Sequence, residues 1–228
     1  MPRRSLVGKS SFEQVYELLT YTAVALELSK EDSDAEVADL AGPVLKLVLR
    51  WETLDRERRE QRRLQLRANA LCKRRDIQLD AAIVTLHADA LAHVAQDRQG
   101  PLFARLFPKP VSTLTRPALQ AQVPIARMLL DRLVAAETPT NLRKAHDKAL
   151  KAAIDRGEAA LREREVLVAA ASSLAERIDA LRVDGDAVLL QIEGALALLA
   201  SKRRLGKEFV YSFFPEPGQS PKKPKKPA

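Results

Sequence analysis

Two long stretches of the chain, residues 34–75 and 138–181, are expected to be helical because neither contains a strong stop signal. Apolar residues follow helical spacing through the second stretch, whereas in the first this pattern becomes poor beyond Leu54. In the first, only Gly42-Pro43 interrupts the expected helix, near its start, and predicts a kink or a restart. A helix of about 30–40 residues is about 45–60 Å long, which exceeds the usual length in globular proteins. The chain is therefore expected to form a bundle or a coiled coil of long helices.

The composition favours the same fold class. Aromatic residues make up 4% of the chain and it has only 8 glycines, whereas 46% of its residues are hydrophobic. A chain poor in the aromatic and β-branched residues that strands prefer, yet apolar enough for a core, is predicted to be all-α. We expect an elongated antiparallel helical bundle of about six helices, arranged as two pseudo-repeated three-helix units with long central helices.

Shorter helices are expected around the long ones. The first begins near Ser10 or Ser11, where Ser10 and Glu13 have capping-box spacing, and ends near Lys30. A helix is also expected over residues 118–136, with Pro124 requiring a kink or a later start.

Two further helices are expected where the long stretches end. Over residues 77–97, one side of a helix carries Ile77, Ala81, Val84, Leu91 and Val94. "VDGD" at 183–186 is expected to separate the second long helix from a last helix over 186–204, which Gly206 would stop.

These elements predict a domain organisation. Residues 10–110 form helical unit 1 and residues 118–217 form helical unit 2, packed together as one domain. Residues 111–117 are a proline-rich linker, residues 1–9 a flexible N-terminus, and residues 218–228 a disordered Pro/Lys tail.

An internal repeat is indicated at a shift of 106 residues. "RWETLDRER" at 50–58 then lies over "RGEAALRER" at 156–164 with five identities, which include Glu52 over Glu158 and Arg58 over Arg164. The pattern predicts a tandem duplication with a pseudo-symmetric bundle. Chance similarity remains the alternative, because residues 59–79 add no identity and Arg and Glu are common in this chain.

The chain has two Phe-Pro segments, and one follows the last helix of each expected unit. A shift of 107 residues places Phe107 and Pro108 over Phe214 and Pro215. The preferred interpretation is structural: the aromatic rings cap the helix ends and seal the bundle, and the prolines turn the chain outward. Both phenylalanines are then buried, whereas exposure of both would favour a docking motif for a partner.

Basic residues concentrate between positions 50 and 75, a stretch that contains ten basic and four acidic residues. A helix would align five arginines over about 27 Å, and four lysines follow near the C-terminus. A solvated helix face is the preferred interpretation, and an acidic protein partner or the phosphates of a nucleic acid are the alternatives. The candidate contacts are Arg56, Arg59, Arg63, Arg67, Arg74, Lys222, Lys223, Lys225 and Lys226.

No pattern in the sequence indicates catalysis. "GKSS" at 8–11 resembles the end of a phosphate-binding loop but lacks the earlier glycine and a preceding strand. His87, His93 and His146 have no ligand spacing and are expected to be ordinary surface or edge residues. With a single cysteine, Cys72, the chain is predicted to be no enzyme and to use no catalytic residue, metal, cofactor or small-molecule ligand.

The predicted function is therefore that of a non-catalytic intracellular scaffold or protein-interaction module, acting through helix packing or self-association. The alternative is a sequence-independent nucleic-acid-binding protein that uses the arginine-rich helix face and the lysine-rich tail. The cytoplasm is the expected location, because the first residues lack the apolar core of a signal peptide and no apolar stretch is long enough to span a membrane. Binding to a membrane surface is disfavoured, because the apolar helix faces are rich in alanine.

Overall fold

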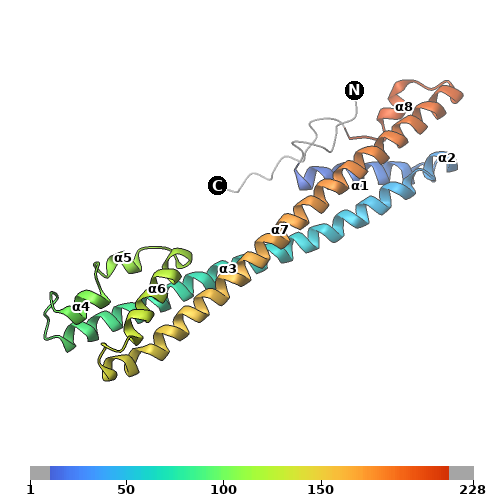
Figure 1. Ribbon diagram of the computed structural model, residues 1–228. Helices are drawn as coiled ribbons and strands as arrows, with labels where there is room; N and C mark the ends of the chain where they lie inside the picture. Colours follow the sequence, from blue (N-terminus) through green and yellow to red (C-terminus); the bar gives the residue numbers. More distant parts are fainter. Residues whose placement is uncertain (1–10, 216–228) are drawn as a thin grey trace, which may run out of the picture. The chain divides into compact units, whose positions relative to one another are not determined.

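The computed structural model describes residues 11–215, and every regular element in this range is an α-helix (Figure 1). The predicted all-α bundle is confirmed. The elements are α1 (Phe12–Leu28), α2 (Ala35–Ala38), α3 (Ala41–His93), α4 (Pro101–Leu106), α5 (Ser112–Thr115), α6 (Leu119–Val134), α7 (Thr140–Arg203) and α8 (Lys207–Tyr211).

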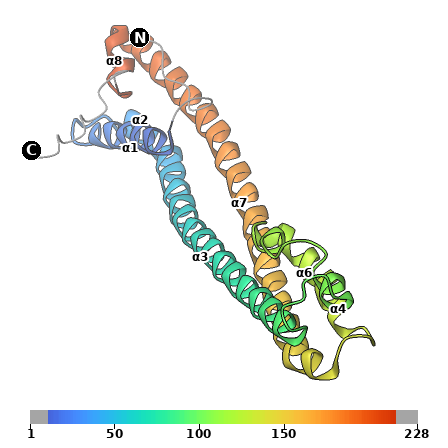
Figure 2. The ribbon, with the colours of Figure 1, turned by 90° about the vertical axis from the view of Figure 1, so that its left-hand side faces the viewer.

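The chain divides into two compact units, and both long helices contribute to each. Unit 1 comprises residues up to 59 and residues from 171 onwards, so it holds α1, α2, α8, the first part of α3 and the last part of α7. Unit 2 is Glu60–Ala170 and holds α4, α5, α6, the last part of α3 and the first part of α7 (Figure 2). Each unit thus contains residues from both of the expected halves, 10–110 and 118–217.

In unit 1 the two long helices run antiparallel. Arg50 contacts Asp184 at 3.1 Å and Arg177 contacts Glu57 at 2.5 Å, so advancing along α3 means going back along α7. The core lies between these helices, α1 and the segment around α8, with Trp51 fully buried at its centre.

Unit 2 has the same antiparallel arrangement. The Cys72 thiol donates to the carbonyl oxygen of Ala160, and the His146 Nε2 atom lies 2.9 Å from Asp89. Helix α6 packs on both long helices through a buried row that includes Leu119, Val123 and Leu129. The segment 111–117, expected as a linker, carries α5 and contributes the buried Leu114 to this core.

Several predicted helix ends are confirmed, and the caps differ in detail. Helix α1 begins after Ser11, which forms a capping box with Gln14 rather than the expected Ser10 with Glu13. The helix restarts at Ala41, just before Gly42-Pro43, where proline in a first turn costs no hydrogen bond.

Two predicted interruptions are absent from the long helices. Helix α3 continues through residues 75–77, and α7 continues through "VDGD" at 183–186. Gly185 lies in the middle of α7 and is buried. Buried residues on both sides of each position, Cys72 and Leu79 in α3 and Leu181 and Leu189 in α7, pack in the cores. This packing outweighs the weak helix propensity of glycine and aspartate. Helix α7 ends at Arg203 with Arg204 at a φ of 57°, and Gly206 instead caps the start of α8.

Buried positions recur along α3 and α7 at the shift of 106 residues. The N-cap residues recur too, since Gly100 precedes α4 and Gly206 precedes α8. An aromatic pair also recurs, with ring centroids 5.5 Å apart in Phe103–Phe107 and 5.3 Å apart in Phe209–Phe213. A tandem duplication predicts this correspondence. The matching buried pairs are Val44/Leu150, Leu47/Ala153, Leu54/Ala160, Ala68/Leu174, Ile83/Leu189, Leu86/Ile192 and Ala90/Leu196.

Candidate functional site

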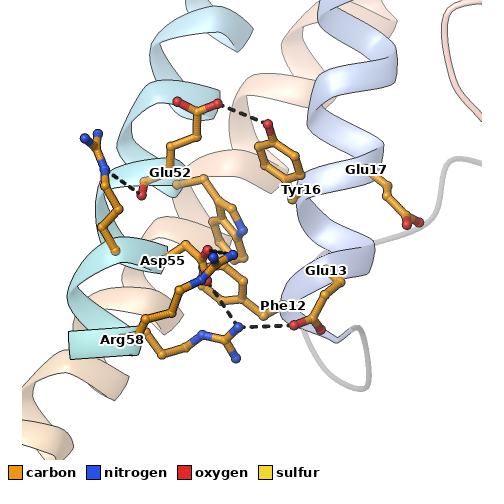
Figure 3. Close-up of a pocket in the computed structure, with 10 residues that line it drawn as sticks. Phe12, Glu13, Tyr16, Glu17, Glu52, Asp55 and Arg58 are labelled. Atoms are coloured by element: carbon orange, nitrogen blue, oxygen red, sulfur yellow. Dashed lines mark hydrogen bonds and ion pairs between the residues drawn. The ribbon is translucent and has the colours of Figure 1, made fainter. Parts of the chain in front are cut away.

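A pocket of about 680 Å³ lies between α1 and α3 in unit 1 (Figure 3). Helix α1 supplies four of its lining residues and α3 the rest, on turns that face each other because the two helices run antiparallel. The lining consists of Phe12, Glu13, Tyr16, Glu17, Trp51, Glu52, Asp55, Arg56, Arg58 and Arg59.

Aromatic rings form the apolar part of this pocket. The ring of Phe12 stacks on Trp51 with centroids 4.3 Å apart, and the guanidinium of Arg58 lies 4.3 Å from the centre of the Phe12 ring. A cation over an aromatic face is attracted by the ring quadrupole. Arg58 therefore covers the apolar contact between α1 and α3 and also brings charge to the pocket.

The charged groups of the pocket are paired with one another. Arg58 reaches Glu13 at 3.1 Å and Asp55 at 3.2 Å, and the Tyr16 hydroxyl donates to Glu52 at 3.0 Å (Figure 3). A backbone hydrogen bond at the helix start and the Arg58 side chain lower the pKa of Glu13, which keeps this carboxylate ionised at neutral pH. Proton transfer near neutral pH favours a carboxyl group with a raised pKa, whereas the pKa of Glu13 is lowered. The contacts in this pocket therefore suit the joining of two helices.

The arginines predicted to contact a partner are all exposed, but they have different surroundings. In unit 1, Arg59 pairs with Asp55, and Arg56 donates to the backbone oxygen of Glu52. In unit 2, Arg63 pairs with Glu60 at 2.8 Å, and Arg67 and Arg74 also face solvent. Lys222, Lys223, Lys225 and Lys226 lie outside the described residues.

The three histidines have three different environments. His87 is half-buried against the rings of Phe103 and Phe107, and its pKa is lowered by burial and by the nearby Arg98 cation. His146 is buried, so its expected position at the surface or an edge is wrong, whereas His93 is exposed. Among residues 11–215, no group of three or more His, Cys, Asp or Glu side chains is placed to hold a metal ion.

The Phe-Pro segments have buried rings, as expected. Phe107 and Phe214 are 6% and 7% exposed, in the cores of unit 2 and unit 1 respectively. Phe107 is the C-cap residue of α4, Pro108 is exposed and Pro215 is partly exposed. Burial of both rings leaves little of either phenylalanine for a partner to contact.

The sequence reasoning missed two exposed apolar helix faces, because it identified the apolar side of residues 77–97 without deciding which side faces the core. Leu79, Ile83 and Leu86 are buried there, whereas Ile77 and Val84 are 60% and 49% exposed. We call two sets of exposed positions, 106 residues apart, the α3 face and the α7 face. The α3 face, in unit 2, is Ile77, Ala81, Val84, Ala88 and Ala92, and the α7 face, in unit 1, is Val183, Ala187, Leu190, Gly194 and Leu198.

Comparison of the chain with protein-family models, with curated proteins and with solved structures finds no match. Within the range that the structure describes, no helix combines the length and the apolar character that crossing a membrane requires.

Proposed function

We propose that this protein is a non-catalytic helical scaffold in the cytoplasm that binds protein partners through exposed faces of its long helices. The observation that carries the proposal is the recurrence of an exposed apolar face at equivalent positions of α3 and α7. Single exposed apolar residues are normal on protein surfaces, but aligned ones that recur in two units indicate an interaction surface.

The surroundings of two glycines support this interpretation. An added Cβ at Gly157 would meet side-chain atoms of Leu119 at 3.2 Å and Val123 at 3.3 Å, so the close approach of α6 explains that glycine. An added Cβ at Gly194 would meet no atom within 4 Å. Glycine in an exposed helix interior costs about 1 kcal/mol relative to alanine, and the close approach of a partner helix would offset that cost.

The composition of the two faces favours a helical partner. Alanine or glycine separates the branched residues of each face, which lets a second helix approach closely. An amphipathic helix that binds a lipid surface carries bulkier apolar residues, together with Lys and Arg on its polar side.

The scaffold proposal is tested with charges placed in the two faces. The double variant V84E/L190E should keep its helical circular dichroism, because both side chains are exposed. Its set of cross-linked partners, including other copies of itself, should shrink relative to the wild type. M128E, at an exposed apolar position of α6 outside both faces, is the control. An identical set of partners for all three proteins would contradict the proposal.

Nucleic-acid binding is the second candidate, supported by the exposed charges of unit 2. Residues 60–75 contain six basic residues and one acidic residue, and Arg67 and Arg74 face solvent. Contacts with phosphates release counterions, so affinity should fall steeply as salt is raised.

The variant R63E/R67E/R74E should abolish a gel shift of duplex DNA at low salt, whereas R156E, at an exposed position of α7, should leave it unchanged. No shift of DNA or RNA by the wild type at low salt would remove this candidate.

A further inference from the structure

We propose that the partner of the α3 face is the α7 face of a second copy of this chain, with the two helices parallel. The inference rests on the scaffold function proposed above and specifies its partner. It follows from the spacing, the charge and the exposure of the two faces.

The spacing of the faces matches position by position. Both have steps of four, three, four and four residues, which confines each to an arc of about 80° on a helix of 3.6 residues per turn. Parallel alignment of Ile77 with Val183 places Val84 beside Leu190 and Ala88 beside Gly194. In the first four layers, branched side chains alternate with alanine or glycine, and the small residues let the two backbones approach. The fifth layer pairs Ala92 with Leu198.

The charges next to the faces determine the orientation. One turn before Ile77 stands Lys73, and one turn before Val183 stands Asp179, whose side chain is 72% exposed in a pair with Arg182. Parallel alignment therefore places Lys73 opposite Asp179 in the layer that precedes the apolar ones. Antiparallel alignment, with Ile77 beside Leu198, would place Lys73 opposite Lys202 and Asp179 opposite Gln96, so neither charge would meet an opposite one.

Neighbouring residues repeat this contrast in charge. Next to Lys73, α3 carries the exposed Arg74, and about one turn before Asp179, α7 carries the exposed Glu176, whereas the nearby Arg177 is paired with Glu57. The partner of the cationic end of the α3 face should be acidic, and the chain itself supplies an acidic end with the matching apolar spacing. This complementarity identifies a second copy as the occupant of the face.

The contact joins two different surfaces, and every copy has both of them. Two such contacts can close a symmetric dimer, and single contacts can extend a chain of copies. Charge reversals distinguish this pairing from association through any other surface, because reversed charges on two different variants complement each other.

Sedimentation velocity on the full chain, over a range of concentrations, provides the test. Wild type should associate, whereas K73E alone and D179K alone should weaken association at least about tenfold, since each places like charges together. An equimolar mixture of K73E and D179K should associate again, because the introduced glutamate then faces the introduced lysine, and Lys73 of one variant faces Asp179 of the other. The control K144E, at an exposed position of α7 outside both faces, should behave as wild type.

Two results would overturn the inference: a wild type that stays monomeric at the highest concentration, or a mixture that associates no better than its components. If a monomeric wild type still cross-linked to other proteins in a manner that V84E/L190E abolished, the scaffold function would stand without self-pairing. If the wild type neither associated nor cross-linked, both proposals would fail.

Discussion

Two glycines at single positions separate the requirements of the fold from those of association. Gly194→Ala removes the backbone entropy cost of glycine in an open environment and should stabilise the folded chain by about 0.5–1 kcal/mol. Gly157→Ala gains the same propensity but crowds Leu119 and Val123, so it should give no net gain. Urea unfolding of both variants under monomeric conditions measures the difference, and equal stabilisation would contradict the assigned surroundings.

His87 should give the stability of the protein a pH dependence. Burial and Arg98 lower its pKa in the folded state, whereas an unfolded histidine has a pKa of about 6.5. Below that pH the unfolded chain binds the proton more readily, so stability should fall as the pH decreases from about 7 to 5.5. His87→Gln should make this fall shallower, and His93→Gln, at an exposed position, should not. Denaturant midpoints across this range test the prediction, and equal slopes in wild type and His87→Gln would refute it.

At the scale of elements, two of the five identities seen at a shift of 106 residues make equivalent contacts. Arg58 contacts Glu13 at the start of α1, and Arg164 contacts Gln120 at the start of α6, with 3.1 Å between the polar atoms in both cases. Glu52 and Glu158 also make equivalent contacts with these short helices, through Tyr16 and Arg127. Each pair therefore joins a short helix to the long helix that follows it.

Hydrogen exchange should detect these contacts element by element. Arg58→Ala should speed exchange in α1, and Arg164→Ala should speed it in α6. The first effect should be larger, because Arg58 also pairs with Asp55 and covers the Phe12 ring. Cation–π contacts contribute about 0.5–1 kcal/mol at exposed sites. Arg63→Ala serves as a control, since it removes an exposed ion pair with Glu60 within α3 alone. Faster exchange spread equally over all helices would contradict this local role.

The sequence predicted the class of these elements better than their limits. Capping residues and helical spacing placed α1 and α6 within a few residues of their observed ends. The expected break at 183–186 was wrong, because Gly185 is buried within α7. Helix propensity describes local preferences and does not account for such long-range packing. The two exposed faces could not be predicted either, because alanine and valine at helical spacing also describe a buried face.

On the scale of the whole molecule, the two units have cores of similar construction. Residues that match at the shift of 106 are buried in these cores, such as Val44 in unit 1 and Leu150 in unit 2. Trp51 and Gly157 are also equivalent, and their difference in volume is accommodated locally. Trp51 stacks on Phe12 in unit 1, whereas Leu119 and Val123 approach Gly157 in unit 2.

This construction predicts that neither half of the chain folds alone. A fragment of residues 1–110 keeps the buried row of α3, from Val44 to Ala90, but lacks the α7 residues that cover it in both cores. A fragment of residues 111–228 has the reciprocal defect. Each fragment at low concentration should lack cooperative thermal unfolding by circular dichroism, because isolated helices without tertiary packing are marginally stable.

An equimolar mixture of the two fragments should recover cooperative unfolding, with a midpoint that rises with concentration because the two chains must associate. The intact chain, diluted equally, should show a constant midpoint wherever it is monomeric. Cooperative unfolding of either fragment as a monomer would mean that a half carries its own core, contrary to the shared cores of the two units.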